Sequence, residues 1–292
     1  MKNHRDLVVK DNTLTNASYT LSLVEQRLIL LAIVAARESN LNLQSKHKLL
    51  VTADSYAKQF NVVRQAAYLA LKEACENLFE RRFSFEERNG KVKQVKSRWV
   101  SRIAYIEEHA EVEIVFADDV IPLITELEAR FTQYELKQIS GLSSAYAIRL
   151  YELLIAWRST GKTTLLGLDE FKNKLGVNAG DYSRADNFKR RVLDIAIKQI
   201  NENTDIFVEY EQHKQGRVIT GFSFSFKFKK APKAEKQKAL ASPKTQDLDA
   251  EKREAYAQFI GYQQRAKLLN EPLENLITKK ELAQFRKFEF MR

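Results

Sequence analysis

The pattern of apolar and polar positions is clearest between residues 187 and 229, where it changes from one period to another. In "NFKRRVLDIAIKQIN", residues 187–201, apolar side chains recur with the spacing of a helix that is buried over most of its circumference. In "GFSFSFKFK", residues 221–229, alternate residues are phenylalanine, which is typical of a strand with one buried face. The preceding "DIFVEYEQ", residues 205–212, predicts its partner strand, joined through the turn "HKQGR". The pattern therefore predicts a long helix followed by a β-hairpin.

The helix predicted over residues 187–201 carries one narrow polar face. Projected at about 100° per residue, Arg191 lies within that face and Arg190 at its flank, whereas Lys189 lies almost on the opposite side. The polar face comprises Arg184, Asn187, Arg191, Asp194 and Lys198. The rest of the circumference comprises Phe188, Val192, Leu193, Ile195, Ala196, Ile197 and Ile200. Such a ridge is either an ordinary solvated surface or a binding face for an anionic partner.

The chain contains an internal repeat. "LLVTADSYAKQFNV", residues 49–62, aligns with "TLLGLDEFKNKLGV", residues 164–177, and further on Phe85 aligns with Phe207. Each copy predicts a long helix, a short strand, a short helix, a tight turn, a second longer helix and two strands. This is the order of a winged helix-turn-helix. In the first copy the order assigns the wing to "ERNGKVKQVKSRW", residues 87–99.

These elements predict an α+β fold of two tandem winged helix-turn-helix domains related by internal duplication. We expect the first domain over residues 1–129 and the second over residues 130–230. Residues 231–292 begin with "APKAEKQKALASPKTQDLDA", which is typical of a flexible linker. Further on, "TKKE", residues 278–281, predicts a helix that starts with a capping box. The tail is therefore expected to be a linker followed by short helices.

The charge of the chain favours a polyanionic partner. The net charge is +10 with 48 Lys and Arg against 38 Asp and Glu. The excess is concentrated after residue 129, because residues 1–129 carry equal numbers of basic and acidic side chains. Locally basic surfaces of this kind are what contact with nucleic-acid phosphates requires.

The second copy supplies the main candidates for DNA binding. In a helix-turn-helix the second helix enters the major groove, with its N-terminal residues on the base edges. Arginine reads guanine and asparagine reads adenine there, and the helix N-terminus favours a phosphate. The candidates are Arg184, Asn187, Lys189, Arg190, Arg191 and Lys198 on the helix, and Lys214 and Arg217 on the wing. Lys189 is expected to touch a phosphate or to lie along the surface rather than to read a base.

In the first copy, the second helix carries fewer residues that could contact bases, whereas the hairpin is more basic. Its helix keeps only Arg64, Gln65 and Tyr68 as candidate readers. Its hairpin carries Lys91, Lys93, Lys96 and Arg98. We therefore expect the second domain to read sequence and the first domain to hold the DNA backbone.

Several other chemistries are disfavoured. The phosphate-loop-like "AWRSTGKTT" has Ala156 where that motif needs glycine, and it follows a predicted helix instead of a strand. The four histidines are scattered, and the single cysteine allows no internal disulfide. The longest apolar run, "LILLAIVAA", is too short to cross a bilayer. We therefore expect a cytoplasmic protein that is not an enzyme, with no metal, cofactor or membrane partner.

The sequence resembles the theta-type plasmid replication initiators, which bind iterons through two tandem winged helices. The resemblance covers roughly residues 7–230 and rests on "NTLTNASYTLSLVEQRLILLAI", "KSRWVSRIAYIEE", "LSSAYAIRLYELLIAWR", "NFKRRVLDIAIKQINENTDI" and "KQGRVITGFSFSF". It implies that monomers bind directly repeated origin sites in double-stranded DNA and recruit a host replication initiator and the replicative helicase. It also implies that dimers, in equilibrium with monomers and joined through the first domain, bind an inverted repeat and repress the protein's own gene. By position, residues 188–191 would be the main base-reading element.

Two functions are compatible with this fold. The leading hypothesis is a non-enzymatic replication initiator. The alternative is a transcriptional repressor of the same fold without initiator activity, since both proteins must bind specific duplex DNA. Two unlike winged helices in one chain favour direct repeats over a palindrome.

Overall fold

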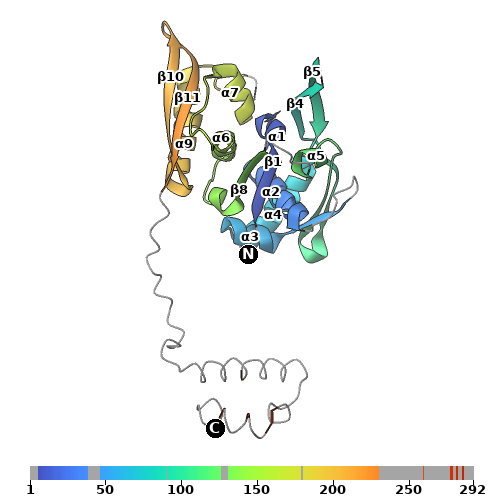
Figure 1. The fold of residues 1–292 in the computed structure, drawn as a ribbon. Coiled ribbons are helices and arrows are strands. Elements are labelled where there is room, and N and C mark those ends of the chain that lie inside the picture. The colour runs from blue at the N-terminus through green and yellow to red at the C-terminus, as the bar shows by residue number, and fades with distance from the viewer. Residues whose placement is uncertain are drawn as a thin grey trace. The chain divides into compact units, whose positions relative to one another are not determined.

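The computed structural model describes residues 6–38, 47–89, 91–125, 131–178 and 180–229, together with residues 259, 277, 278, 281 and 285 (Figure 1). The chain divides into a unit of residues 1–229 and a unit of residues 230–292. In the second unit Thr278 and Glu281 form the predicted capping box. The N–H of Thr278 donates to the Glu281 carboxylate at 2.9 Å, and the N–H of Glu281 donates to the Thr278 hydroxyl at 3.4 Å. The rest of the predicted tail lies outside the described residues.

The first repeat lies in the first half of the larger unit. Its strands are β1 (Leu7–Asp11), β2 (Ser18–Tyr19), β3 (Leu49–Thr52), β4 (Arg82–Asn89), β5 (Lys91–Arg98), β6 (Val100–Ile106) and β7 (Glu111–Phe116). Its helices are α1 (Asn12–Asn16), α2 (Leu23–Glu38), α3 (Ala53–Phe60), α4 (Arg64–Leu78), the 3-10 turn η1 (Glu107–His109) and α5 (Ile121–Thr125). Helix α2 contains the longest apolar run of the sequence and buries Leu28 and Ile33 completely. Each such side chain contributes about 1.5–3 kcal/mol of burial free energy.

The second repeat follows with the predicted order of helix, strand, helix, turn, longer helix and two strands, whereas the first repeat also carries the hairpin of β4 and β5. It comprises β8 (Phe131–Glu135), the 3-10 turn η2 (Leu136–Ile139), α6 (Ala145–Ile155), β9 (Leu166–Gly167), α7 (Leu168–Leu175), α8 (Ala185–Phe188), the π-helical turn η3 (Lys189–Leu193), α9 (Asp194–Asn203), β10 (Ile206–Gln215) and β11 (Val218–Phe228). Elements α8, η3 and α9 follow one another without a break, and we call residues 185–203 the recognition helix. No helix in the described part of the chain is long and apolar enough to cross a membrane.

Sheet topology confirms the duplication and corrects one prediction. In the second repeat the strand order is β10-β11-β9, and in the first it is β6-β7-β3. The equivalents of β10 and β11 are therefore β6 and β7, not the hairpin of β4 and β5. That hairpin pairs with β2 in a separate sheet and is an insertion after α4. The assignment of the first wing to residues 87–99 was wrong, because alternating strand patterns resemble one another whichever sheet they join.

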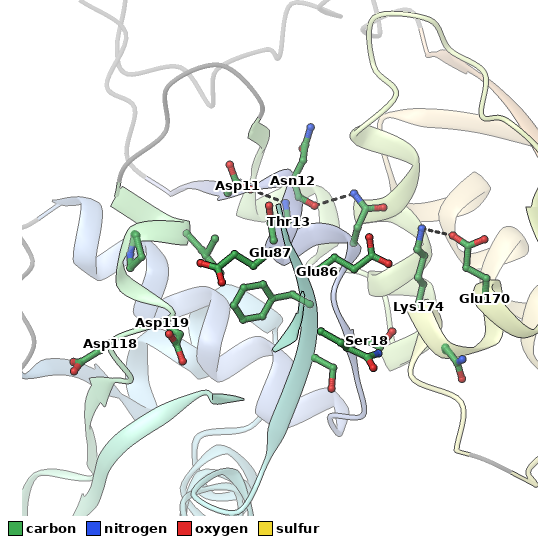
Figure 2. Close-up of a pocket in the computed structure, with 17 residues that line it drawn as sticks. Asp11, Asn12, Thr13, Ser18, Glu86, Glu87, Asp118, Asp119, Glu170 and Lys174 are labelled. Carbon is green, nitrogen blue, oxygen red and sulfur yellow. Dashed lines mark hydrogen bonds and ion pairs between the residues drawn. The ribbon is translucent and has the colours of Figure 1, made fainter. Parts of the chain in front are cut away.

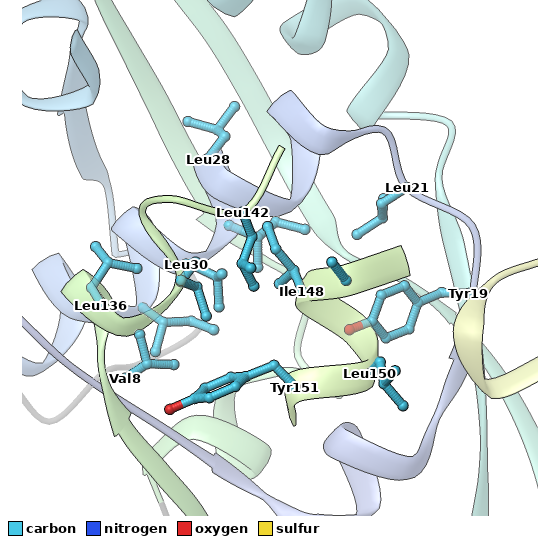
Figure 3. Close-up of a cluster of buried hydrophobic side chains, with 14 of the residues drawn as sticks. Val8, Tyr19, Leu21, Leu28, Leu30, Leu136, Leu142, Ile148, Leu150 and Tyr151 are labelled. Atoms are coloured by element: carbon cyan, nitrogen blue, oxygen red, sulfur yellow. The ribbon is translucent and has the colours of Figure 1, made fainter. Parts of the chain in front are cut away.

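The two repeats share one continuous core (Figure 3). Val8 and Leu28 from the first repeat and Leu136, Ile148 and Tyr151 from the second are all buried in it. Strand β1 pairs antiparallel with β8, so the chain start is tied to the beginning of the second repeat. The predicted boundary between residues 129 and 130 falls within residues 126–130, which lie outside the described residues, and it stays a prediction.

Candidate nucleic-acid interface

Helix α7 and the recognition helix form the helix-turn-helix of the second repeat. The turn begins at Gly176, whose φ of +80° is left-handed. A Cβ at this position would lie 2.3 Å from the carbonyl oxygen of Tyr19, so only glycine fits. The short first helix is thereby held against the segment that follows β2.

The apolar side of the recognition helix packs on an aromatic cluster. Phe188 is completely buried, and its ring lies 5.9 Å from that of Phe171 on α7. Phe171 in turn lies 5.3 Å from Phe224 on β11. Alternate phenylalanines of β11 therefore anchor both helices of the motif, as the period-two pattern predicted.

The N-terminal half of the recognition helix is π-helical between residues 189 and 193. Arg190 and Arg191 both lie on its exposed side. Among the described residues neither arginine has an ion-pair or hydrogen-bond partner. Both guanidinium groups lie in the N-terminal part of the recognition helix. In a helix-turn-helix, this is the part that binds guanine edges or phosphates.

Lys189 has a different environment. Its Nζ lies 2.9 Å from the carboxylate of Asp194, to which the hydroxyl of Tyr210 on β10 also donates at 2.6 Å. The Tyr210 hydroxyl and the Asp194 carboxylate raise the pKa of Lys189 above its ordinary value. This lysine is therefore already paired inside the protein.

The other predicted helix residues differ in accessibility. Arg184 is exposed and forms an ion pair with Asp186 at 2.9 Å, just before the helix. Asn187 is half-buried, and its enclosed Oδ1 atom has no hydrogen-bond partner within the described part of the chain. Lys198 is exposed, 4.0 Å from the carboxylate of Glu202.

One predicted core residue of this helix is exposed. Ile195 was assigned to the apolar circumference, but 47 % of it is accessible to solvent. It follows Arg191 by one helical turn and therefore belongs to the solvent-facing side. The remaining predicted apolar positions are buried, including Ile197 at 9 % exposure.

The wing of the second repeat is the hairpin of β10 and β11, as predicted. Lys214 and Arg217 are exposed on either side of Gly216, which has a φ of +62°. The pairing shifts between His213 and Lys214, which marks a bulge near the tip. The tip therefore presents two cations away from the core.

The candidate readers of the first repeat are mostly engaged within the protein. Arg64, at the start of α4, forms an ion pair with Asp54 at 2.6 Å. Gln65 is exposed. Tyr68 is half-buried, with its ring 5.4 Å from that of Tyr105 on β6.

The cations of the inserted hairpin do not form one surface. In the register of the two strands, Lys93 lies opposite Glu87 and Lys96 lies opposite Ser84. Because Lys93 and Lys96 are three residues apart on one strand, they project from opposite faces. Arg98 donates to the carbonyl oxygen of Phe79 at 2.5 Å and is thus partly committed to the protein. The side chain of Lys91 lies outside the described residues.

A cavity of about 1130 Å³ lies between this hairpin, α1, α5 and α7 (Figure 2). Its acidic lining residues are Asp11, Glu86, Glu87, Asp118, Asp119 and Glu170. Lys174 also lines it and is paired with Glu170 at 2.7 Å. Such an acidic surface repels phosphates, which disfavours this cavity as a contact for DNA.

The groups that could support other chemistry are few in the described part of the chain. No group of three or more His, Cys, Asp or Glu residues there is placed to hold a metal ion. Cys75 is buried, and burial raises the pKa of its thiol to about 12. A thiol in this state is a packing residue.

Three features of this region could not be found from the sequence. They are the π-helical turn, the pairing of Lys189 with Asp194 and Tyr210, and the acidic cavity. The contact with Tyr210 and the acidic cavity depend on elements that are distant in the sequence, and a projection at constant angle cannot show the π-helical turn. The sequence offered one signal for the ion pair, the five-residue spacing between Lys189 and Asp194. In a regular α-helix, side chains at this spacing do not meet, so the spacing alone does not predict a pair.

Comparisons with known proteins agree with the two winged helices. Residues 7–155 match the family model of the first winged helix (WH1) of initiator replication proteins, and residues 167–226 match that of the second (WH2). A replication initiation protein of Escherichia coli is 27% identical over 217 residues, covering 72% of this chain and 66% of its own. A 27.6 kDa protein of Escherichia coli described as uncharacterized is 28% identical over 227 residues, covering 74% of this chain and 94% of its own.

A solved structure shares the fold. The Pi initiator protein, crystallised in complex with iteron DNA, superposes with a TM-score of 0.60 at 22% sequence identity. The match covers 78% of this chain and 100% of that chain. The predicted fold of two winged helix-turn-helix domains is therefore confirmed.

Proposed function

Because the chain belongs to the family of initiator replication proteins with two winged-helix domains, we propose that it initiates plasmid replication by binding directly repeated origin sites as a monomer. One observation of this chain carries the proposal. Arg190 and Arg191 are exposed on the recognition helix, and among the described residues nothing neutralises them. They are therefore available for a DNA duplex without first breaking an ion pair.

The relatives support the same function. One relative is named a replication initiation protein, and the Pi initiator was crystallised with iteron DNA. By analogy, the recognition helix of this chain lies in a major groove and its wing, with Lys214 and Arg217, contacts the adjacent backbone. The second domain is then the main reader of sequence.

The first domain contributes backbone contacts. Arg64 would have to leave Asp54, and Tyr68 would have to leave Tyr105, before either could read a base. Gln65, Lys93 and Lys96 are exposed, and no side chain among the described residues has to release them first. Lysines attract phosphates without regard to sequence, so this domain adds affinity more than specificity.

The proposal includes two assemblies. Monomers bind the repeats in the cytoplasm and recruit a host replication initiator and the replicative helicase. Dimers joined through the first domain bind an inverted repeat and repress the gene. We also propose that the chain is not an enzyme and needs no cofactor, so supercoiled origin DNA should stay uncut in its presence with Mg²⁺ or Mn²⁺.

Footprinting of the full chain on DNA flanking its gene tests the proposal. Several protected sites in the same direction are expected, and a variant with Arg190→Ala and Arg191→Ala should lose all of them. Lys162→Ala is the matched control, because it removes an exposed cation of the second domain outside the recognition helix. Protection of a single inverted repeat alone would instead identify a transcriptional repressor.

A further inference from the structure

Three side chains from three elements meet beside the two exposed arginines. Lys189 belongs to the π-helical turn, Asp194 begins α9, and Tyr210 lies on the wing strand β10. The Asp194 carboxylate accepts from Lys189 at 2.9 Å and from the Tyr210 hydroxyl at 2.6 Å. The Tyr210 ring is itself fixed, 5.7 Å from the ring of Phe222. We call Lys189, Asp194 and Tyr210 the positioning cluster.

The ion pair in this cluster requires the π-helical turn. Residues five apart in an α-helix lie about 140° apart around the axis, so their side chains do not meet. Here the N–H of Asp194 donates to the carbonyl oxygen of Lys189, which is the backbone bond of a π-helix. Lys189 and Asp194 are thus joined both through the backbone and through their side chains. The pair stabilises this turn and would be lost in an α-helix.

The turn decides where the neighbouring arginines point. If residues 189–193 returned to α-helical geometry, the segment before the turn would rotate by roughly 100° relative to α9. Arg190 and Arg191 directly follow Lys189 and would change direction with it. A rotation of this size separates a guanidinium from a base edge, although the number of charges on the helix stays the same.

We propose that Lys189, Asp194 and Tyr210 are positioning residues for sequence recognition, which hold the π-helical turn so that Arg190 and Arg191 face the bases. This rests on the proposed function of the chain as a sequence-specific DNA-binding protein. Lys189 accordingly makes no phosphate contact, since its charge is paired with Asp194. It determines specificity through the two arginines beside it.

The test compares variants on a preferred duplex and on its scrambled version. The preferred duplex is the sequence that the wild-type full chain enriches from a random duplex pool. Affinities for both are measured over a range of salt concentrations, and circular dichroism melting checks that each variant is folded. The variants are Lys189→Met, Asp194→Asn and Tyr210→Phe, with Lys189→Arg as the conservative replacement. Lys198→Met is the control, because it removes one exposed cation from the same helix.

Lys189→Met should lower affinity for the preferred duplex by about 5- to 150-fold, the discrimination of one well-placed base contact. Affinity for the scrambled duplex and the salt slope should change far less. Lys189→Arg should recover most of the loss. Lys198→Met, in contrast, should weaken both duplexes alike and reduce the salt slope by about one.

Asp194→Asn separates positioning from electrostatics. Removing a carboxylate near DNA should strengthen binding to both duplexes if only charge matters. If Asp194 instead positions the two arginines, Asp194→Asn should lower the affinity for the preferred duplex. Tyr210→Phe keeps the ring and removes one hydrogen bond, so it should show a smaller loss of the same kind in a folded protein.

Two results would overturn the proposal. One is an equal loss on both duplexes for Lys189→Met with a lower salt slope, which would make Lys189 a phosphate contact. The other is tighter binding of Asp194→Asn to both duplexes. If the wild-type chain enriches no sequence at all, the proposed function fails too, whereas a preference that survives all the variants defeats the positioning role alone.

Discussion

Arg149 and Glu152 form an ion pair of 3.0 Å on adjacent turns of α6, with both side chains at most 2% exposed. Glu152 also pairs with Lys10 of β1 and accepts from the hydroxyl of Tyr134 at 2.6 Å. Arg149 donates to the carbonyl oxygens of Thr15, Ala17 and Lys174. This pair therefore ties the first repeat to helices α6 and α7 of the second. It is one of the contacts that hold the two winged helices together, besides the shared core and the pairing of β1 with β8.

Breaking this pair should destabilise the whole 1–229 unit. Glu152→Gln leaves two buried cations without a carboxylate, and we expect a loss of about 3–5 kcal/mol in the free energy of unfolding. Urea denaturation followed by circular dichroism measures it. Asp186→Asn is the matched control, because it breaks the exposed pair with Arg184 and should change stability far less. Equal effects of the two substitutions would contradict the structural role of Glu152.

The same carboxylate should make stability depend on pH. Burial alone would raise the pKa of Glu152, but the charges of Lys10 and Arg149 outweigh it and lower that pKa below the ordinary value. A carboxylate with a lowered folded-state pKa stabilises the protein above its unfolded pKa, roughly pH 4, and the benefit is lost as the pH falls further. The difference in unfolding free energy between wild type and Glu152→Gln should therefore narrow below about pH 4. A constant difference from pH 7 to pH 3 would contradict this.

Two isoleucines of the recognition helix provide a test of its orientation. Ile197 is 9% exposed and Ile195 is 47% exposed. Ile197→Ala should cost about 2–4 kcal/mol in unfolding free energy, because it leaves a cavity in the core. Ile195→Ala should cost less than about 1 kcal/mol. The reverse order would mean that the helix packs with another face inward.

Substitutions of Arg191 and Lys96 should reduce DNA binding in different ways. If Arg191 reads a base edge, as we propose, Arg191→Ala should cost about 1–3 kcal/mol on the preferred duplex and much less on a scrambled one. Lys96→Ala should weaken both duplexes alike and lower the salt slope by about one. Tyr68→Ala should lose less specificity than Arg191→Ala, because Tyr68 packs on Tyr105. Titrations at two salt concentrations distinguish these outcomes, and equal losses for Arg191→Ala on both duplexes would show that sequence is read elsewhere.

The buried thiol of Cys75 should report unfolding. Because burial raises its pKa to about 12, few molecules carry the reactive thiolate at pH 8. Alkylation should be far slower in the native chain than in urea, and its rate should rise in Glu152→Gln in proportion to the fraction unfolded. Equally fast alkylation of native and unfolded chain would show that Cys75 is accessible.

Elements were predicted correctly from the sequence where the local pattern of side chains matches the way the element packs. Alternate phenylalanines predicted β11 correctly, and the Thr278 and Glu281 capping box formed as expected. The apolar face of the recognition helix was correct except for Ile195. The internal repeat predicted both helix-turn-helix motifs, because each copy must bury the same faces.

The features that the sequence did not predict depend mostly on contacts between residues that are far apart in the sequence. Arg149 stands within the apolar "AIRLYELLI", and nothing local indicates that its hydrogen-bond partners include the carbonyl of Thr15. The inserted hairpin resembles a wing because strand periodicity does not record which sheet a strand joins. The pairing of Lys189 with Asp194 could not be predicted, because a projection at constant angle cannot show a π-helical turn.

The pairing of β1 with β8 sets an order of events during synthesis. Leu7–Asp11 leaves the ribosome early, but its partner Phe131–Glu135 is translated about 120 residues later. At typical elongation speeds of about 5–20 residues per second, the nascent strand waits roughly 6–24 s for its partner. Its unpaired edge is open to chaperones or to a neighbouring nascent chain throughout that interval. A fragment that ends at residue 129 lacks β8, so its β1 would stay unpaired. An N-terminal fragment that folds by itself should therefore extend beyond β8.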